Sequence, residues 1–166
     1  MTSKFYTISL LLFIFIQFHI NVVAQKVKVA CVGNSITAGY LLESPQAYPV
    51  VLQSLMGSDY EVKNFGVSGT TFLVTTGDDW SYWGVNGKMD EVKSYLPDII
   101  IIELGTNDSK STYSALRDSL ESDIEKMIIE FKGLSSNPTI YVCVSPPAFN
   151  TNFDIQPMAL LSYSSH

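Results

Sequence analysis

The feature that most restricts the fold of this chain is a set of short runs that are apolar at nearly every position. Asp98–Leu104 is the strongest of these runs, and Val27–Val32 and Thr139–Val144 have the same character. Strands that are apolar on both faces are typical of a parallel sheet, because crossover helices cover both sides of such a sheet. We therefore predict an α/β domain with a parallel sheet and right-handed crossovers.

Between these runs the sequence predicts a short strand and three helices. The strand is Tyr60–Asn64, and the segment after it, Phe65–Asp79, is a loop rich in Gly, Ser and Thr. The expected helices are Pro45–Met56, Lys88–Leu96 and Ala115–Phe131. The first has an apolar face made of Val50, Val51, Leu55 and Met56. The last has a continuous apolar stripe at helical spacing, made of Leu116, Leu120, Ile124, Met127, Ile128 and Phe131.

The first 24 residues have the pattern of a secretory signal peptide. Lys4 gives a positive start, Ile8–Ile16 is an unbroken apolar run, and Val22–Ala24 offers small residues for cleavage. The alternative is a membrane anchor, left uncleaved or linked to lipid, but the run is far shorter than the ~20 residues that span a bilayer. We expect cleavage after Ala24 and a secreted or extracytoplasmic protein, periplasmic if it is bacterial.

The rest of the chain is long enough for one domain, which we place at residues 25–149, with an irregular tail at 150–166. The formal net charge is −6 at pH 7, and loss of Lys4 with the leader makes the mature protein more negative. Such a charge argues against nucleic acid and anionic membranes as partners. It is compatible with neutral sugar or lipid esters.

The two cysteines, Cys31 and Cys143, both lie in predicted strands. In a 2-1-3-4 strand order those strands are not neighbours and stand about 9–10 Å apart, beyond the reach of a disulfide. We expect two buried free thiols. Two cysteines alone do not form a structural zinc site.

Three polar blocks follow predicted strands, and two of them close apolar runs. Gly33–Thr37 and Gly105–Asp108 close the runs, and Asn64–Gly69 contains the end of the short strand. The carboxyl ends of parallel strands are where ligands and chemistry collect. A serine in such a turn, Ser35, has an exposed hydroxyl, while the Asn107 side chain and the Gly66 N–H can donate hydrogen bonds to an oxyanion.

These blocks together resemble the SGNH hydrolases, also called GDSL-type esterases and lipases. Asn34 replaces the aspartate that is usual in the first block, and the resemblance covers residues 26–149. It implies a flavodoxin-like parallel sheet with helices on both faces and Ser35 as the catalytic nucleophile. It also implies an oxyanion hole from the Ser35 and Gly66 N–H groups and the Asn107 side chain, with no metal or organic cofactor.

The pattern is most similar to the branch of the family that acts on carbohydrates. We expect a secreted serine esterase that hydrolyses acyl esters, chiefly acetyl esters, on small molecules or glycans. The aromatic cluster Trp80–Trp83 could stack on sugar rings or pack against the surface of the domain itself. Taken singly, Gly33–Thr37 could also be an ordinary turn or a phosphate cradle, and Asn107–Asp108 could cap the segment after it.

One family block is absent from this sequence. SGNH hydrolases carry Asp-x-x-His near the C-terminus, whereas the last four residues here are Tyr163–His166, and the other histidine is His19 in the leader. We expect a sheet that is incomplete at its C-terminal side and an esterase that is impaired by loss of the histidine block. The alternatives are an active enzyme with an unrecognised base, an inactive fragment that binds acetylated glycans, and the unstable product of an interrupted gene.

Overall fold

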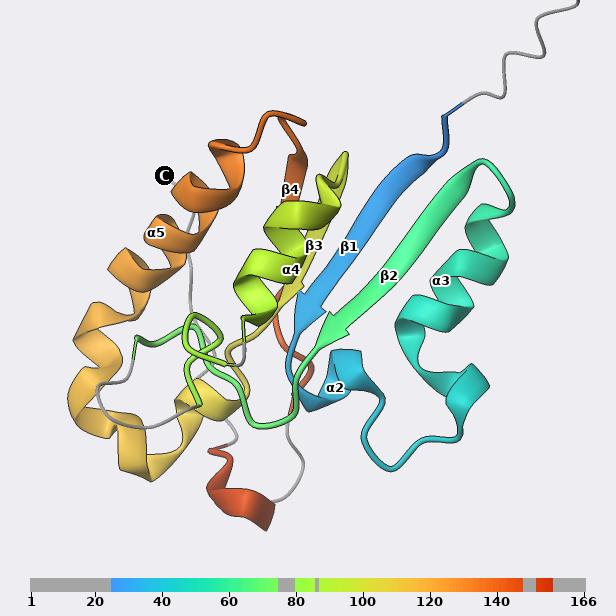
Figure 1. Ribbon diagram of the computed structural model, residues 1–166. Coiled ribbons are helices and arrows are strands. Elements are labelled where there is room, and N and C mark those ends of the chain that lie inside the picture. The colour runs from blue at the N-terminus through green and yellow to red at the C-terminus, as the bar shows by residue number, and fades with distance from the viewer. Residues whose placement is uncertain (1–24, 75–79, 86, 148–151, 157–166) are drawn as a thin grey trace, which may run out of the picture.

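The computed structural model describes residues 25–74, 80–85, 87–147 and 152–156, and Figure 1 shows how their elements are arranged. The expected leader, both histidines and most of the expected tail lie outside the described residues. None of the helices formed by the described residues has the length and apolar character needed to cross a bilayer.

A four-stranded sheet forms the centre of the domain. Its strands are β1 (Val27–Gly33), β2 (Tyr60–Gly66), β3 (Ile99–Glu103) and β4 (Thr139–Val142). They lie in the order β2-β1-β3-β4, and every neighbouring pair is parallel. The predicted parallel α/β sheet is confirmed, and its order is the flavodoxin-like one that the resemblance implied.

Helices cover both faces of this sheet (Figure 1). Besides the short α2 (Ser35–Ala38), the chain forms α3 (Tyr48–Met56), α4 (Lys88–Tyr95) and α5 (Leu120–Lys132). Short 3-10 turns complete the set: η1 (Ser44–Gln46), η2 (Asn107–Ser109), η3 (Ser111–Ser119) and η4 (Asn152–Asp154). As Figure 1 shows, α4 and α5 lie next to each other on one side of the sheet, whereas α3 lies beside β2 and α2 follows the end of β1.

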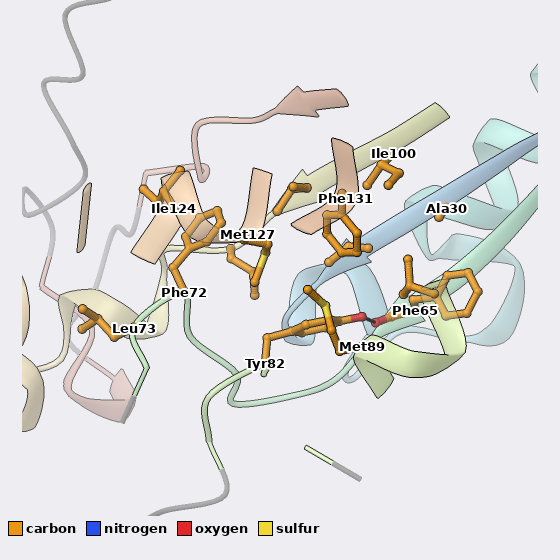
Figure 2. Close-up of a cluster of buried hydrophobic side chains, with 14 of the residues drawn as sticks. Ala30, Phe65, Phe72, Leu73, Tyr82, Met89, Ile100, Ile124, Met127 and Phe131 are labelled. Carbon is orange, nitrogen blue, oxygen red and sulfur yellow. Dashed lines mark hydrogen bonds between the residues drawn. The ribbon is translucent and has the colours of Figure 1, made fainter. Parts of the chain in front are cut away.

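The hydrophobic core lies between the sheet and the pair α4 and α5. Ile100 and Ile102 of β3 point into it, as do Met127 and Phe131 of α5, and each of these four side chains is fully buried. Figure 2 shows that the segment after β2 also enters this core, through Phe72, Leu73 and Tyr82. Phe72 and Leu73 of the loop predicted after β2 are therefore part of the core.

Two predicted helices differ from the observed ones. The helix predicted from Ala115 is an α-helix only from Leu120 onward. The residues before it form the 3-10 turn η3, and Leu116 in that turn is exposed. In α3 the expected buried face is largely exposed, with Val50, Val51 and Leu55 among the exposed apolar residues. This helix lies along the edge of β2, so only part of its surface can be covered.

Both cysteines are free, as expected, but only Cys31 is buried. Cys143 is exposed because β4 ends at Val142, at the edge of the sheet, and no described strand covers its outer side. The prediction of two buried thiols is wrong for Cys143.

Candidate active site

The turn after β1 presents Ser35 at the start of α2. Asn34 caps this helix: its Oδ1 accepts a hydrogen bond from the Ile36 N–H at 2.9 Å, and its main-chain oxygen accepts one from the Ala38 N–H at 2.9 Å. Asn34 is fully buried and Ser35 is half-buried. Such a cap fixes the direction in which the chain enters the helix, and it thereby fixes the place of the Ser35 side chain.

Close packing at the end of β1 requires glycine at position 33. A Cβ atom there would lie 2.0 Å from Thr37 Oγ1 and 2.5 Å from the main-chain oxygen of Glu103. The main-chain oxygen of Gly33 accepts a hydrogen bond from the Val67 N–H at 2.9 Å and a longer one from Thr70 Oγ1 at 3.4 Å. The end of β1 is thus bonded directly to the loop after β2.

Asn107 reaches the same loop from the other side. It is buried in η2, directly after β3, and its Nδ2 donates a hydrogen bond to the main-chain oxygen of Thr70 at 3.0 Å. The Thr70 hydroxyl in turn donates to the main-chain oxygen of Val67 at 2.8 Å. A side-chain amide nitrogen carries two hydrogens, so this bond orients the amide and leaves its second N–H for a ligand.

A cavity of about 660 Å³ brings Ser35 and Asn107 together. Ser68 and Gly69, from the loop after β2, line the same cavity. Aromatic and aliphatic side chains form much of the remaining wall: Tyr40, Trp80, Tyr113, Phe153 and Ile155. Three segments that are far apart in the sequence therefore meet at one cavity, at the carboxyl end of the sheet.

Gly66, the third predicted site residue, does not line this cavity. Its N–H donates a hydrogen bond to Asn64 Oδ1 at 2.8 Å, and a Cβ atom at this position would lie 2.3 Å from the Ala38 nitrogen. Gly66 therefore serves close packing between β2 and α2. Gly69 is the glycine of the second block that reaches the cavity, and it has a φ of 90°. The signal for it was present in the sequence, three residues after Gly66 in the same block.

Asp108 is a functional candidate that sequence reasoning treated only as a possible cap. It is buried, and its two carboxylate oxygens accept hydrogen bonds from the N–H groups of Phe72 at 3.2 Å and Leu73 at 2.9 Å. Burial raises the pKa of this carboxyl to about 6, and the backbone hydrogen bonds oppose that shift. Asp108 therefore holds the loop after β2 against the segment that carries Asn107.

Glu103, at the end of β3, is a second buried carboxyl that the sequence did not single out. Thr37 Oγ1 lies 3.4 Å from its Oε2, and its Oε1 has no hydrogen-bond partner among the described residues. Burial raises its pKa to about 7, and the nearby hydroxyls of Ser145 and Thr37 oppose that shift. Glu103 thus lies next to the turn that carries Ser35, paired with Gly33 in the register of β1 and β3.

Within the described ranges, no three side chains of His, Cys, Asp and Glu are grouped as metal ligands. Histidine is not among the described residues. The arrangement that can act chemically is a serine hydroxyl in one cavity with a side-chain amide and a glycine backbone, which is suited to acyl transfer.

Comparisons with known proteins point to the same chemistry. The model of the GDSL-like lipase/acylhydrolase family matches residues 31–162. The chain is 32% identical over 150 residues to an acetylxylan esterase from Xylanibacter ruminicola, a match that covers 79% of this chain and 31% of that protein. It is 27% identical over 129 residues to an arylesterase from Vibrio mimicus, covering 76% of this chain and 59% of the relative. The matches thus span about a third to three fifths of these relatives.

Solved structures agree on the fold. A carbohydrate acetylesterase from Sinorhizobium meliloti superposes with a TM-score of 0.62 at 25% identity, covering 74% of this chain and 65% of that one. An aryl esterase from M. smegmatis superposes with a TM-score of 0.58 at 22% identity, covering 72% of this chain and 64% of that one.

Proposed function

The chain belongs to the GDSL-like lipase/acylhydrolase family, and from this premise we propose that it is a secreted serine esterase that removes acetyl groups from carbohydrates. The observation that carries the proposal is the cavity shared by Ser35, Gly69 and Asn107. The similarity to an acetylxylan esterase and to a carbohydrate acetylesterase supports the choice of substrate. The signal-like sequence of the first 24 residues supports secretion.

In the proposed reaction Ser35 Oγ attacks the acyl carbon of the ester. Negative charge then develops on the carbonyl oxygen, and the N–H groups of Ser35 and Gly69 and the Asn107 Nδ2 donate hydrogen bonds to it. The ester C–O bond breaks, the sugar oxygen takes the proton that Ser35 lost, and water then hydrolyses the acyl-enzyme, which releases acetate and restores the serine hydroxyl. Gly69 takes the role expected of Gly66, because the Gly66 N–H is already bonded to Asn64 Oδ1.

We further propose that turnover by these 166 residues is slow. In a Ser-His-Asp esterase a histidine takes the serine proton, and here Tyr163 stands where the aspartate of an Asp-x-x-His block would precede His166. Enzymes that lack one triad member keep a residual ~10³–10⁴-fold acceleration over water from the oxyanion hole and binding. A protein that binds acetylated glycans without turning them over is the second candidate, and it rests on the same sequence difference.

Hydrolysis of p-nitrophenyl acetate and acetate release from acetylated xylan test the proposal. Ser35→Ala should remove the protein-dependent rate, and Ser54→Ala, an exposed serine on α3, should leave it unchanged. Added imidazole should raise the rate of the wild type above that of Ser35→Ala, because imidazole can act as the base that takes the serine proton. A wild-type rate equal to that of Ser35→Ala, with and without imidazole, would favour the binding protein. A family-like rate that survives Ser35→Ala would exclude the assigned nucleophile.

A further inference from the structure

The aromatic cluster Trp80–Trp83 divides into a buried part and an exposed part. Tyr82 is fully buried in the core, where its hydroxyl donates a hydrogen bond to the main-chain oxygen of Phe65 at 2.6 Å. Trp83 is half-buried and packs against the same core. Trp80, in contrast, is 51% exposed and lines the cavity that contains Ser35. Core packing therefore accounts for Tyr82 and Trp83 but not for the exposed surface of Trp80.

The Trp80 ring rests on the bare backbone of Gly69. A Cβ atom at position 69 would lie 2.5 Å from Cζ3 and 2.6 Å from Cε3 of the ring. Any larger residue at 69 would push the ring away, and the positive φ of Gly69 also disfavours one. The ring thus packs directly on a residue that lies beside Ser35 and Asn107 in the cavity.

The backbone of Trp80 is also held in place. Its main-chain oxygen accepts a hydrogen bond from the Thr71 N–H at 3.0 Å, and the Thr71 oxygen accepts one from the Tyr82 N–H at 3.1 Å. These bonds form a parallel bridge between Thr71 and Ser81, both of which are buried. An aromatic side chain that is fixed before binding loses little conformational entropy when a ligand contacts it.

The cavity around the ring combines apolar and polar groups, as binding of a sugar requires. Hydroxyl, amide and ammonium groups line the cavity beside its apolar wall, from Ser68, Asn107, Lys110 and Thr112. A pyranose ring has an apolar face of C–H groups, which can lie on an aromatic ring, and hydroxyls at its edge, which need such polar partners. The net charge of −6 disfavours a polyanionic ligand.

We propose that Trp80, seated on Gly69, is a stacking site for a neutral pyranose ring of a glycan chain, next to the ester that reaches Ser35. The inference deepens the proposed function, because it makes the substrate an oligosaccharide or polysaccharide and not a small free ester. Binding at this site involves no covalent step. It can therefore be measured whether or not the protein turns over an ester.

The test is binding of xylohexaose and of its acetylated form to the purified full chain, by calorimetry and by tryptophan fluorescence. Trp80→Ala should weaken binding by ~10-fold or more, which corresponds to loss of an aromatic contact. Trp80→Phe, which keeps an aromatic ring, should bind more tightly than Trp80→Leu. Tyr141→Ala, which removes an exposed aromatic ring at the sheet edge, is the matched control and should bind like the wild type.

Two results would overturn the inference. One is a wild type that binds neither oligosaccharide, and the other is equal binding by Trp80→Phe and Trp80→Leu when circular dichroism shows both to be folded. Ser35→Ala separates this inference from the proposed function, because it should retain glycan binding. Glycan binding that depends on Trp80, without any hydrolysis that depends on Ser35, would support the stacking site and reject the esterase.

Discussion

The Asn107 side chain donates a hydrogen bond from Nδ2 to the main-chain oxygen of Thr70, over 3.0 Å. This bond joins the block after β3 to the block after β2, and it determines which side of the Asn107 amide can face the cavity. The expected donor geometry of the oxyanion hole thus depends on a contact between segments that are far apart in the sequence.

Asn107→Ala should lower kcat for p-nitrophenyl acetate by ~10²–10³-fold, because one oxyanion donor is lost. The measurement is the rate that depends on Ser35, with imidazole present if the unassisted rate is too low. Asn107→Asp, which has a similar shape but cannot donate when ionised, should lose at least as much. A kcat within twofold of the wild type in either variant would remove Asn107 from the site.

Thr70→Val should disturb the site without touching its donors. The variant loses the hydroxyl bond to the Val67 oxygen, which keeps its bond from the Thr70 N–H at 3.3 Å, so we expect a cost of about 0.5–1.5 kcal/mol in unfolding free energy. Thr70→Ser keeps the hydroxyl and should recover most of the loss. Urea unfolding and kcat measured on both variants check this prediction. It is wrong if Thr70→Val and Thr70→Ser have the same unfolding free energy and the same kcat.

Asp108→Ala should destabilise the loop after β2, because the N–H groups of Phe72 and Leu73 lose their carboxylate partner. We expect a loss of about 2–4 kcal/mol in unfolding free energy, from two buried donors left unpaired. Asp108→Asn keeps one side-chain oxygen and should lose less. Asp118→Ala, which replaces an exposed aspartate, is the control and should unfold like the wild type.

Glu103 should make stability depend on pH. Its pKa is raised from 4.5 to about 7 in the folded protein, so its contribution to stability is present below pH 4.5 and is lost as the pH rises through 7. The expected loss is about 3 kcal/mol at most. The unfolding free energy of Glu103→Gln should change less between pH 4.5 and pH 7.5 than that of the wild type. Equal slopes for the two proteins in urea titrations would contradict the shift.

The two edge strands of the sheet, β2 and β4, should differ in how readily they pair with another copy of the protein. At the β2 edge, Gln53 Oε1 of α3 accepts a hydrogen bond from the Val62 N–H at 2.7 Å, which occupies part of that edge. At the β4 edge no described strand follows, and Tyr141 and Val142 are exposed. An open apolar edge is a template for pairing with other chains, so we expect the purified protein to oligomerise through β4.

Lysine at both Tyr141 and Val142 should reduce this association in size-exclusion chromatography and sedimentation. Lysine at both Val50 and Leu55, exposed residues of α3, adds the same charge away from the β4 edge and serves as the control. If both pairs raise solubility equally, net charge is the cause and the edge is not.

The sequence by itself determined the layered α/β architecture and two of the residues that meet at the cavity. The run Asp98–Leu104 and the stripe on α5 are local patterns, and burial of their apolar side chains requires a sheet with helices packed on it. Ser35 and Asn107 were predictable because each follows a strand end, and parallel strands bring their carboxyl ends to one edge.

The tertiary structure alone decided which donors and rings reach the cavity. Two glycines of the second block were equivalent in the sequence, but Asn64 occupies the N–H of Gly66, while Gly69 lies in the cavity under Trp80. Leu116, which fitted the helical stripe, is exposed because η3 precedes α5. Hydrophobic periodicity predicts which face of a single helix or strand is buried. Whether an N–H group or an aromatic ring can contact a ligand depends instead on which segments, distant in the sequence, already bond to it or pack on it.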